Sequence, residues 1–332
     1  MLFLLMGKKK FTRFHLRGGR RPRYTLEMPS PKVARNPHRR RITEERNAAS
    51  KDLDRMSSLE IIRLMNREDR KVVPAVGRAI PAITRAVDEI VKRMKSGGRL
   101  IYVGAGSSGR IGVLDALECP PTFGVSANLV RGVVAGGKKA LTQSVEGAED
   151  RPGDAARDLQ KIRLTRLDSV VGIAASGTTP YVLGGITYAK HRGALTVGVA
   201  ANGRSPLAKS AKIAITPEVG PEILAGSTRL KAGTSQKMVL NMLSTAVMVR
   251  LGHAYENLMI DVGEANEKLR ERAKWILIQA SDRDVSAVTR ALRQSGHDLR
   301  LALIMLKRGL SAKRARRLLL QSRGNLRRAL GE

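Results

Sequence analysis

Aromatic residues, cysteines and long apolar runs are all scarce in this chain. Only 3 % of its 332 residues are aromatic, which argues against a surface that stacks nucleic acid bases. The single cysteine, Cys119, excludes a disulfide framework and fits a reducing compartment such as the cytoplasm. No apolar run approaches the length that spans a membrane, so no membrane association is expected. The five histidines are scattered rather than spaced like metal ligands, and no metal site is expected.

Positive charge, in contrast, is in large excess. The formal net charge is +32, and residues 1–41 carry thirteen Lys and Arg against one acid. Residues 301–332 carry nine against one. Such ends attract nucleic acids or anionic lipids, but a general arginine bias explains them as well, and nucleic acid is not expected as a partner. The segment 1–41, rich in Arg, Pro and Gly, is predicted to be a basic disordered leader.

Strands and helices alternate from about residue 43. Helical apolar spacing predicts helices over Ser57–Asn66, which opens with capping residues, and Val73–Lys95. Strands are predicted at Leu100–Ala105, Leu129–Ala135, Val170–Ala175, Leu195–Ala200 and Lys212–Pro217. Further helices are predicted from Ser108 and over Ala155–Ile162, Pro180–Arg192 and Ala232–Leu251. The strands are apolar throughout, which is typical of a parallel sheet covered by helices on both faces. After about residue 270, a small bundle of about three helices is predicted.

Two loops rich in Gly and Ser each follow a predicted strand and open a helix. The first is Gly104-Ala-Gly-Ser-Ser-Gly109, and the second is Ser176-Gly-Thr-Thr-Pro180. Hydroxyls and backbone N–H groups at a helix N-terminus suit a phosphate. Neither loop contains the Gly-Lys-Ser/Thr of a Walker loop, and the first is one residue short of the dinucleotide spacing. Two such loops at the carboxyl edge of one sheet indicate a sugar phosphate rather than a nucleotide.

Charged residues near these loops are candidates for chemistry. Glu118 precedes Cys-Pro-Pro, where a helix is expected to end, and a carboxylate facing the helix dipole there suits a general acid. The segment Val145–Asp150 holds three acids in a basic protein. From the residues alone, solvated and helix-capping acids are the favoured interpretation, and Asp115 is expected to be an ordinary charge on a helix surface. Farther along, Arg229 and Lys231 are placed to reach an anion.

Together these segments resemble the N-acetylmuramic acid 6-phosphate etherases, which are lyases of the sugar isomerase (SIS) fold. The similarity runs from Thr43–Asn47 to Asn257–Val262 and more loosely to the C-terminus. It implies an α/β, three-layer SIS fold over residues 42–270 with a parallel sheet flanked by helices, and a small helical module like the ubiquitin-associated (UBA) fold over residues 271–332. It also implies a homodimer with interfacial active sites.

The resemblance further implies a reaction and the residues that carry it. The D-lactyl ether of the sugar phosphate is eliminated and water is added, without a cofactor. Glu118 matches the proton donor of the family, and Glu149 matches its second active-site glutamate. The phosphate-binding positions are Ser107, Ser108, Ser176, Gly177, Thr179 and Lys231. Two positions depart from the family pattern, because Leu117 replaces a usual serine and Thr178 replaces a usual arginine.

Two other functions of the same fold stay open. One is a non-catalytic sugar phosphate sensor like the glucokinase regulatory protein, and the other is an aldose–ketose isomerase, which also abstracts the carbon 2 proton. The regulatory protein is larger, has a second SIS domain and lacks the Glu-Cys-Pro-Pro segment, so Glu118 favours the lyase. Release of lactate separates the etherase from both alternatives.

Overall fold

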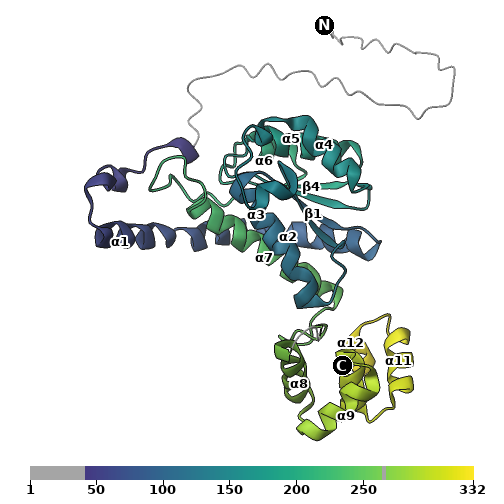
Figure 1. The fold of residues 1–332 in the computed structure, drawn as a ribbon. Coiled ribbons are helices and arrows are strands. Elements are labelled where there is room, and N and C mark those ends of the chain that lie inside the picture. Colours follow the sequence, from purple (N-terminus) through teal and green to yellow (C-terminus); the bar gives the residue numbers. More distant parts are fainter. Residues whose placement is uncertain (1–41, 264–266) are drawn as a thin grey trace, which may run out of the picture. The chain divides into compact units, whose positions relative to one another are not determined.

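The computed structural model describes residues 42–263 and 267–332 (Figure 1). The predicted leader, residues 1–41, lies outside the described residues. The strands are β1 (Leu100–Gly104), β2 (Val130–Val134), β3 (Ser169–Ile173), β4 (Leu195–Val199) and β5 (Ile213–Ile215). The α-helices are α1 (Ser58–Asp69), α2 (Val72–Lys95), α3 (Gly106–Phe123), α4 (Pro152–Lys161), α5 (Pro180–His191), α6 (Pro206–Ser210), α7 (Lys231–Leu251), α8 (Glu267–Ser281), α9 (Val285–Ser295), α10 (Leu299–Arg308), α11 (Ala312–Gln321) and α12 (Leu326–Leu330). None of the helices in these two described ranges is long and apolar enough to cross a membrane.

The five strands form one parallel sheet with the order β2-β1-β3-β4-β5. Side chains alternate between its faces, as a strand requires. Leu100 and Tyr102 of β1 pack with helices α2, α3 and α7, whereas Ile101 and Val103 pack with α4, α5 and α6. The prediction of a three-layer α/β fold is therefore confirmed, and each predicted strand lies within two residues of its observed bounds.

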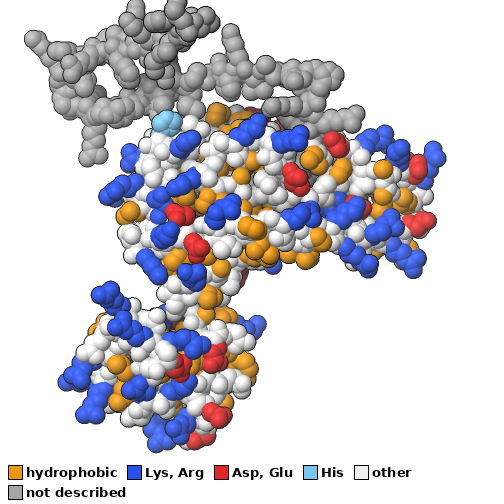
Figure 2. Space-filling model, turned by 180° about the vertical axis from the view of Figure 1, so that it is seen from behind, with side chains coloured by type: hydrophobic (Ala, Val, Ile, Leu, Met, Phe, Trp, Pro, Cys, Tyr) orange, Lys and Arg blue, Asp and Glu red, His pale blue; other side chains and the backbone are white. Residues whose placement is uncertain are grey.

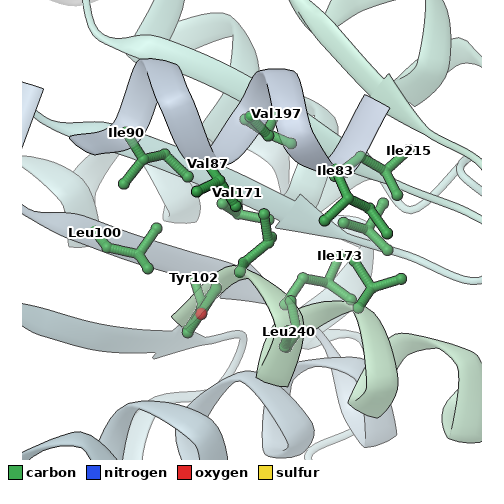
Figure 3. Packing of buried hydrophobic residues seen from close by; sticks show 14 of the residues in the cluster. Ile83, Val87, Ile90, Leu100, Tyr102, Val171, Ile173, Val197, Ile215 and Leu240 are labelled. Atoms are coloured by element: carbon green, nitrogen blue, oxygen red, sulfur yellow. The ribbon is translucent and has the colours of Figure 1, made fainter. Parts of the chain in front are cut away.

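The main core lies between the sheet and the long helix α2, which carries the apolar spacing seen in the sequence. Ile83 and Val87 of α2 meet Val171 and Ile173 of β3, and Leu240 of α7 closes the cluster (Figure 3). Full burial of each such side chain contributes about 1.5–3 kcal/mol. This packing holds α2 and α7 rigidly on one face of the sheet.

A buried ion pair fixes the register of the two strands that precede the Gly/Ser loops. Arg99, just before β1, pairs with Asp168, just before β3, with Nη2 and Oδ2 2.7 Å apart. Asp168 also accepts the backbone N–H groups of Arg99 and Thr165. Because the two strands start together and run in parallel, their carboxyl ends also lie together, with Gly104 opposite Ile173.

Helix α3 does not end at Glu118, as the sequence predicted, but continues through Pro120 and Pro121 to Phe123. A proline has a helical φ, but it removes an N–H donor and crowds the carbonyl group four residues earlier; α3 accommodates both prolines within its last turn. Gly124 ends the helix with φ of +62°, and a Cβ there would lie 2.3 Å from the carbonyl oxygen of Asp261. Glu118 therefore lies in the body of the helix.

The C-terminal helices α8–α12 share a second apolar cluster. This cluster begins at Tyr255, ahead of the boundary predicted at residue 270, and extends to Leu330. Five helices contribute to it rather than about three. Two similar turns start two of them, since the side chain of Asp298 caps α10 and that of Asn325 caps α12.

Charged side chains cover much of the surface. Figure 2 shows Lys and Arg side chains spread over the face that it presents, with Asp and Glu side chains among them. This face offers no single basic stripe of the kind that follows a nucleic acid backbone.

Candidate active site

The two Gly/Ser loops meet at the point where the strand order reverses. β1 and β3 are neighbours, and their outer neighbours β2 and β4 continue the sheet in opposite directions. The first loop leads from β1 into α3, and the second leads from β3 into α5. In open α/β sheets, ligands bind at this crevice beyond the carboxyl ends of the strands. The structure thus brings together Ser107 and Ser108 with the segment from Ser176 to Thr179, as the sequence predicted.

Close contact between strand and helix shapes the first loop. A Cβ on Gly104 would lie 2.7 Å from Cα of Gly109, so only glycine lets β1 and α3 approach this closely. Ser107 and Ser108 follow in the first turn of α3 and are half-buried. Their hydroxyl groups make no hydrogen bond to any of the described residues. They are therefore free to bind a ligand at the positive end of the helix dipole.

The second loop is held by its own polar groups. Gly177 has φ of +68°, and a Cβ there would lie 2.3 Å from Oγ of Ser205. The hydroxyl oxygens of Ser176 and Thr178 lie 2.9 Å apart, and the Thr178 N–H donates to Ser176. Thr179 precedes α5 and is half-buried. This loop follows β3 and therefore lies at the same carboxyl edge of the sheet as Ser107.

Lys231 is buried and paired inside the protein, whereas the sequence predicted that it binds phosphate. It begins α7 with a side chain only 2 % exposed, and its Nζ lies 2.7 Å from Oε2 of Glu68. Glu68 also accepts hydrogen bonds from Lys71 and Asn47. A buried ammonium must be paired, so Lys231 is engaged inside the protein and is left out of the proposed phosphate site.

Glu118 lies beside a pocket between α3 and α7. The pocket has a volume of about 260 Å³ and is lined by Ile111, Leu114, Asp115, Glu118, Lys237 and Asn241. Glu118 itself is exposed. Its neighbours Leu114 and Leu117 on α3 are 53 % and 64 % exposed. An acid that lies beside two exposed leucines and a pocket suits a site that another protein surface covers.

Glu149 lies in the short 3-10 helix Ala148–Asp150 and is exposed. This turn packs against α5, the helix that begins at the second loop. No hydrogen bond links Glu149 to Glu118 or to either loop in the described part of the chain. Among the described residues, no three His, Cys, Asp or Glu side chains are grouped closely enough to hold a metal ion.

Asp115 is buried, whereas the sequence predicted it on the surface of a helix. It is 6 % exposed rather than a surface charge. Its carboxylate accepts hydrogen bonds from Tyr102 (2.7 Å), Asn241 (2.6 Å) and Ser244 (3.0 Å). Burial and the nearby Asp115 charge raise the pKa of Tyr102 well above its ordinary value, so its hydroxyl stays a donor. The sequence contains one indication of this buried network, because its polar members Tyr102, Asn241 and Ser244 lie within apolar segments.

We expect the Asp115→Ala variant to unfold more easily than the wild type. Three buried donors would lose their acceptor, and an unsatisfied buried polar group costs about 1–3 kcal/mol. A loss of about 3 kcal/mol in the free energy of unfolding is expected in urea denaturation. Asp88→Ala is the matched control, because Asp88 is 42 % exposed and, among the described residues, forms an ion pair only with Arg250, across 3.2 Å. Equal losses in the two variants would contradict this account.

A parallel sheet whose switch point carries two Gly/Ser loops defines a class of sugar-phosphate-binding proteins, and comparison with known families agrees. The SIS domain family matches residues 148–246, and the glucokinase regulatory protein N-terminal SIS domain matches residues 82–190. The chain is therefore an SIS-domain protein.

Curated relatives narrow this class. The chain is 50 % identical over 290 residues to the N-acetylmuramic acid 6-phosphate etherase of Clostridium beijerinckii, covering 87 % of this chain and 95 % of that one. It is 51 % identical over 289 residues to the etherases of Pectobacterium atrosepticum and Yersinia pestis, again over 87 % of this chain and over 95 % and 98 % of theirs. The chain belongs to the N-acetylmuramic acid 6-phosphate etherase family.

Proposed function

We propose that this protein cleaves the D-lactyl ether of N-acetylmuramic acid 6-phosphate and releases N-acetylglucosamine 6-phosphate and D-lactate. The observation that carries the proposal is the meeting of two hydroxyl-rich loops at the switch point of the sheet, in a chain that also holds an exposed glutamate beside a pocket. Such an activity serves the breakdown of cell-wall amino sugars. The lone buried thiol of Cys119 fits a reducing compartment, and we place the reaction in the cytoplasm.

The chemistry needs an acid and a base but no metal or redox group. In the open-chain sugar, the aldehyde acidifies the proton on carbon 2. A base removes this proton, the bond between carbon 3 and the ether oxygen breaks, and an acid protonates the departing lactate oxygen. Water then adds to the double bond, with its oxygen on carbon 3 and a proton on carbon 2. Glu118 is the proposed proton donor and Glu149 the second carboxylate, since paired carboxylates alternate these roles.

The proposed phosphate site uses the hydroxyls of Ser107, Ser108, Ser176 and Thr179 and the backbone at Gly177. This phosphate site and Glu118 are separated along α3. About eleven residues of α3 separate Ser107 from Glu118, which is roughly 16 Å at 1.5 Å per residue. Five bonds join the phosphorus atom to carbon 3 of the sugar, which span at most roughly 7 Å at about 1.5 Å per bond. The rise of α3 between the two residues is thus more than twice the length of the substrate between its phosphate and carbon 3, which favours an acid supplied by a second chain.

A second copy of the chain resolves this gap. We place the active sites between the two subunits of a homodimer, with the loops of one subunit facing Glu118 of the other. The exposed Leu114 and Leu117 beside Glu118 supply the apolar surface that such an interface buries.

Mixed dimers test this arrangement. Glu118→Gln removes the acid, and Ser108→Asp places a carboxylate where the phosphate is expected to bind. Each variant alone is expected to be inactive, but mixing and reassembling them is expected to restore lactate release, because one site of each mixed dimer is intact. Reassembly of each variant with itself is the control. If mixing restores no activity although mixed dimers form, the site lies within one subunit.

The function itself is tested by incubating the purified protein with N-acetylmuramic acid 6-phosphate and measuring D-lactate with an enzymatic assay. Lactate release is expected. An isomerised sugar phosphate without lactate would indicate the aldose–ketose isomerase, and binding without turnover would indicate the regulator.

We expect the Thr178→Arg variant to lower the KM for the sugar phosphate with little change in kcat. An arginine makes paired, charge-assisted hydrogen bonds to phosphate, whereas a threonine hydroxyl makes one neutral bond. The change also releases Ser176, whose hydroxyl now lies 2.9 Å from that of Thr178. Steady-state kinetics measure the effect, with Thr178→Gln as a control of similar length without charge. An unchanged or higher KM would show that residue 178 does not face the phosphate.

A further inference from the structure

Lys237 is an exposed cation in the same pocket as Glu118. It projects from α7, whereas Glu118 projects from α3, and Asn241 lies one turn after Lys237 on α7. Lys237 has no hydrogen bond or ion pair with any described residue. Other exposed lysines, such as Lys95 and Lys139, also have no partner among the described residues, and Lys237 differs from them in lining the pocket that contains Glu118. An unpaired cation in a pocket beside an acid indicates an anionic ligand.

The proposed substrate carries two anions, and only one of them is accounted for by the loops. The phosphate is at one end of the sugar. The carboxylate of the lactyl group is at the other, two bonds away from the ether oxygen that Glu118 is proposed to protonate. A group that binds this carboxylate must therefore lie beside Glu118.

We propose that the pocket between α3 and α7 is the binding site for the D-lactyl carboxylate, with Lys237 as its cationic partner and Asn241 as a second donor. This inference rests on the proposed function. Its volume of about 260 Å³ is ample for a lactyl group. Ile111 and Leu114 form an apolar wall, which suits the methyl group.

Asp115 is a positioning residue in this pocket. An ionised aspartate only accepts hydrogen bonds, so it fixes the Asn241 side chain with the amide nitrogen toward itself, 2.6 Å away. One amide hydrogen is then committed to Asp115 and the other is left for a ligand. Ser244 donates to the same oxygen, Oδ1, and Tyr102 donates to Oδ2, so the amide cannot turn without breaking this network.

The Lys237→Met variant tests the proposal. A hydrogen bond to a charged group contributes about 1.5–3 kcal/mol, so the KM for N-acetylmuramic acid 6-phosphate is expected to rise roughly 10- to 100-fold. The inhibition constant of N-acetylglucosamine 6-phosphate, which lacks the lactyl group, is expected to change by less than about twofold. Lys237→Arg keeps the charge and is expected to retain most of the affinity. Lys95→Met is the control, since Lys95 is exposed at the end of α2, before β1 begins.

Two outcomes would overturn the proposal. One is an unchanged KM in Lys237→Met, and the other is an equal loss of affinity for both sugar phosphates, which would show a general electrostatic effect. Lys237 is exposed, so the variant is expected to melt at the wild-type temperature. Failure of the proposed function is a different result, because it appears as absence of lactate release by the wild-type protein.

Discussion

Replacing Glu118 by glutamine is expected to lower the rate of D-lactate release about a hundred- to ten-thousandfold, which is the usual contribution of a general acid or base. Glutamine keeps the size and hydrogen-bonding reach of the side chain but cannot donate the proton that the departing lactate oxygen needs. The effect is expected in kcat more than in KM, because the lost interaction forms mainly in the transition state. A coupled assay for D-lactate measures it.

The fold is expected to survive this change. Glu118 is exposed and forms no hydrogen bond with any described residue, so the melting temperature of Glu118→Gln is expected to match the wild type. Glu146→Gln is the matched control, since Glu146 is also an exposed acid, two residues before Ala148. Near-normal turnover in Glu118→Gln would show that Glu118 is not the proton donor and would leave Glu149 as the candidate.

The second large effect is expected on stability, from Lys231→Met. Lys231 and Glu68 have side chains only 2 % and 3 % exposed. Removing Lys231 leaves the buried Glu68 carboxylate with only Lys71 and Asn47 as side-chain partners, and breaking a buried pair in this way typically costs about 3–5 kcal/mol. The free energy of unfolding in urea is therefore expected to fall by about this amount. The double variant Glu68→Met/Lys231→Met is expected to recover most of it, because no unpaired charge remains in the pair.

The pH dependence of stability gives an independent test of the same pair. Burial opposes ionisation of Glu68, but hydrogen bonds from Lys231, Lys71 and Asn47 outweigh it and lower its pKa from 4.5 to about 2. A carboxylate with a lowered pKa stabilises the fold above its unfolded pKa, by about 3 kcal/mol at neutral pH, and this is lost as the pH falls from about 4.5 toward 2. The difference in the free energy of unfolding between the wild type and Lys231→Met is thus expected to shrink as the pH falls through that range. A constant difference between pH 7 and pH 3 would contradict the assignment.

Local sequence patterns determined the layered sheet and the two loops. The two apolar runs Leu100–Ala105 and Val170–Ala175 are each followed by Gly and Ser residues and then by helical spacing, which defines βα units without any tertiary information. Capping residues likewise indicated where helices begin. Ser57 forms the predicted capping box with Glu60, and Asp298 and Asn325 start their helices in the two repeated turns. These features depend on neighbours within a few residues, which a sequence displays directly.

Tertiary contacts decided which charged residues are buried and paired. The sequence predicted Lys231 at a phosphate and Asp115 on the surface, because no hydrogen-bonding partner of either side chain lies near it in the sequence. Glu68, which pairs with Lys231, lies 163 residues away, and Asn241, which binds Asp115, lies 126 residues away. The prolines after Glu118 predicted the end of a helix, but the contact of Gly124 with Asp261 decided where α3 stops. The sequence by itself determined which elements form and where a phosphate is expected, whereas only the tertiary structure decided which charges are buried and paired, because burial depends on segments that meet only after folding.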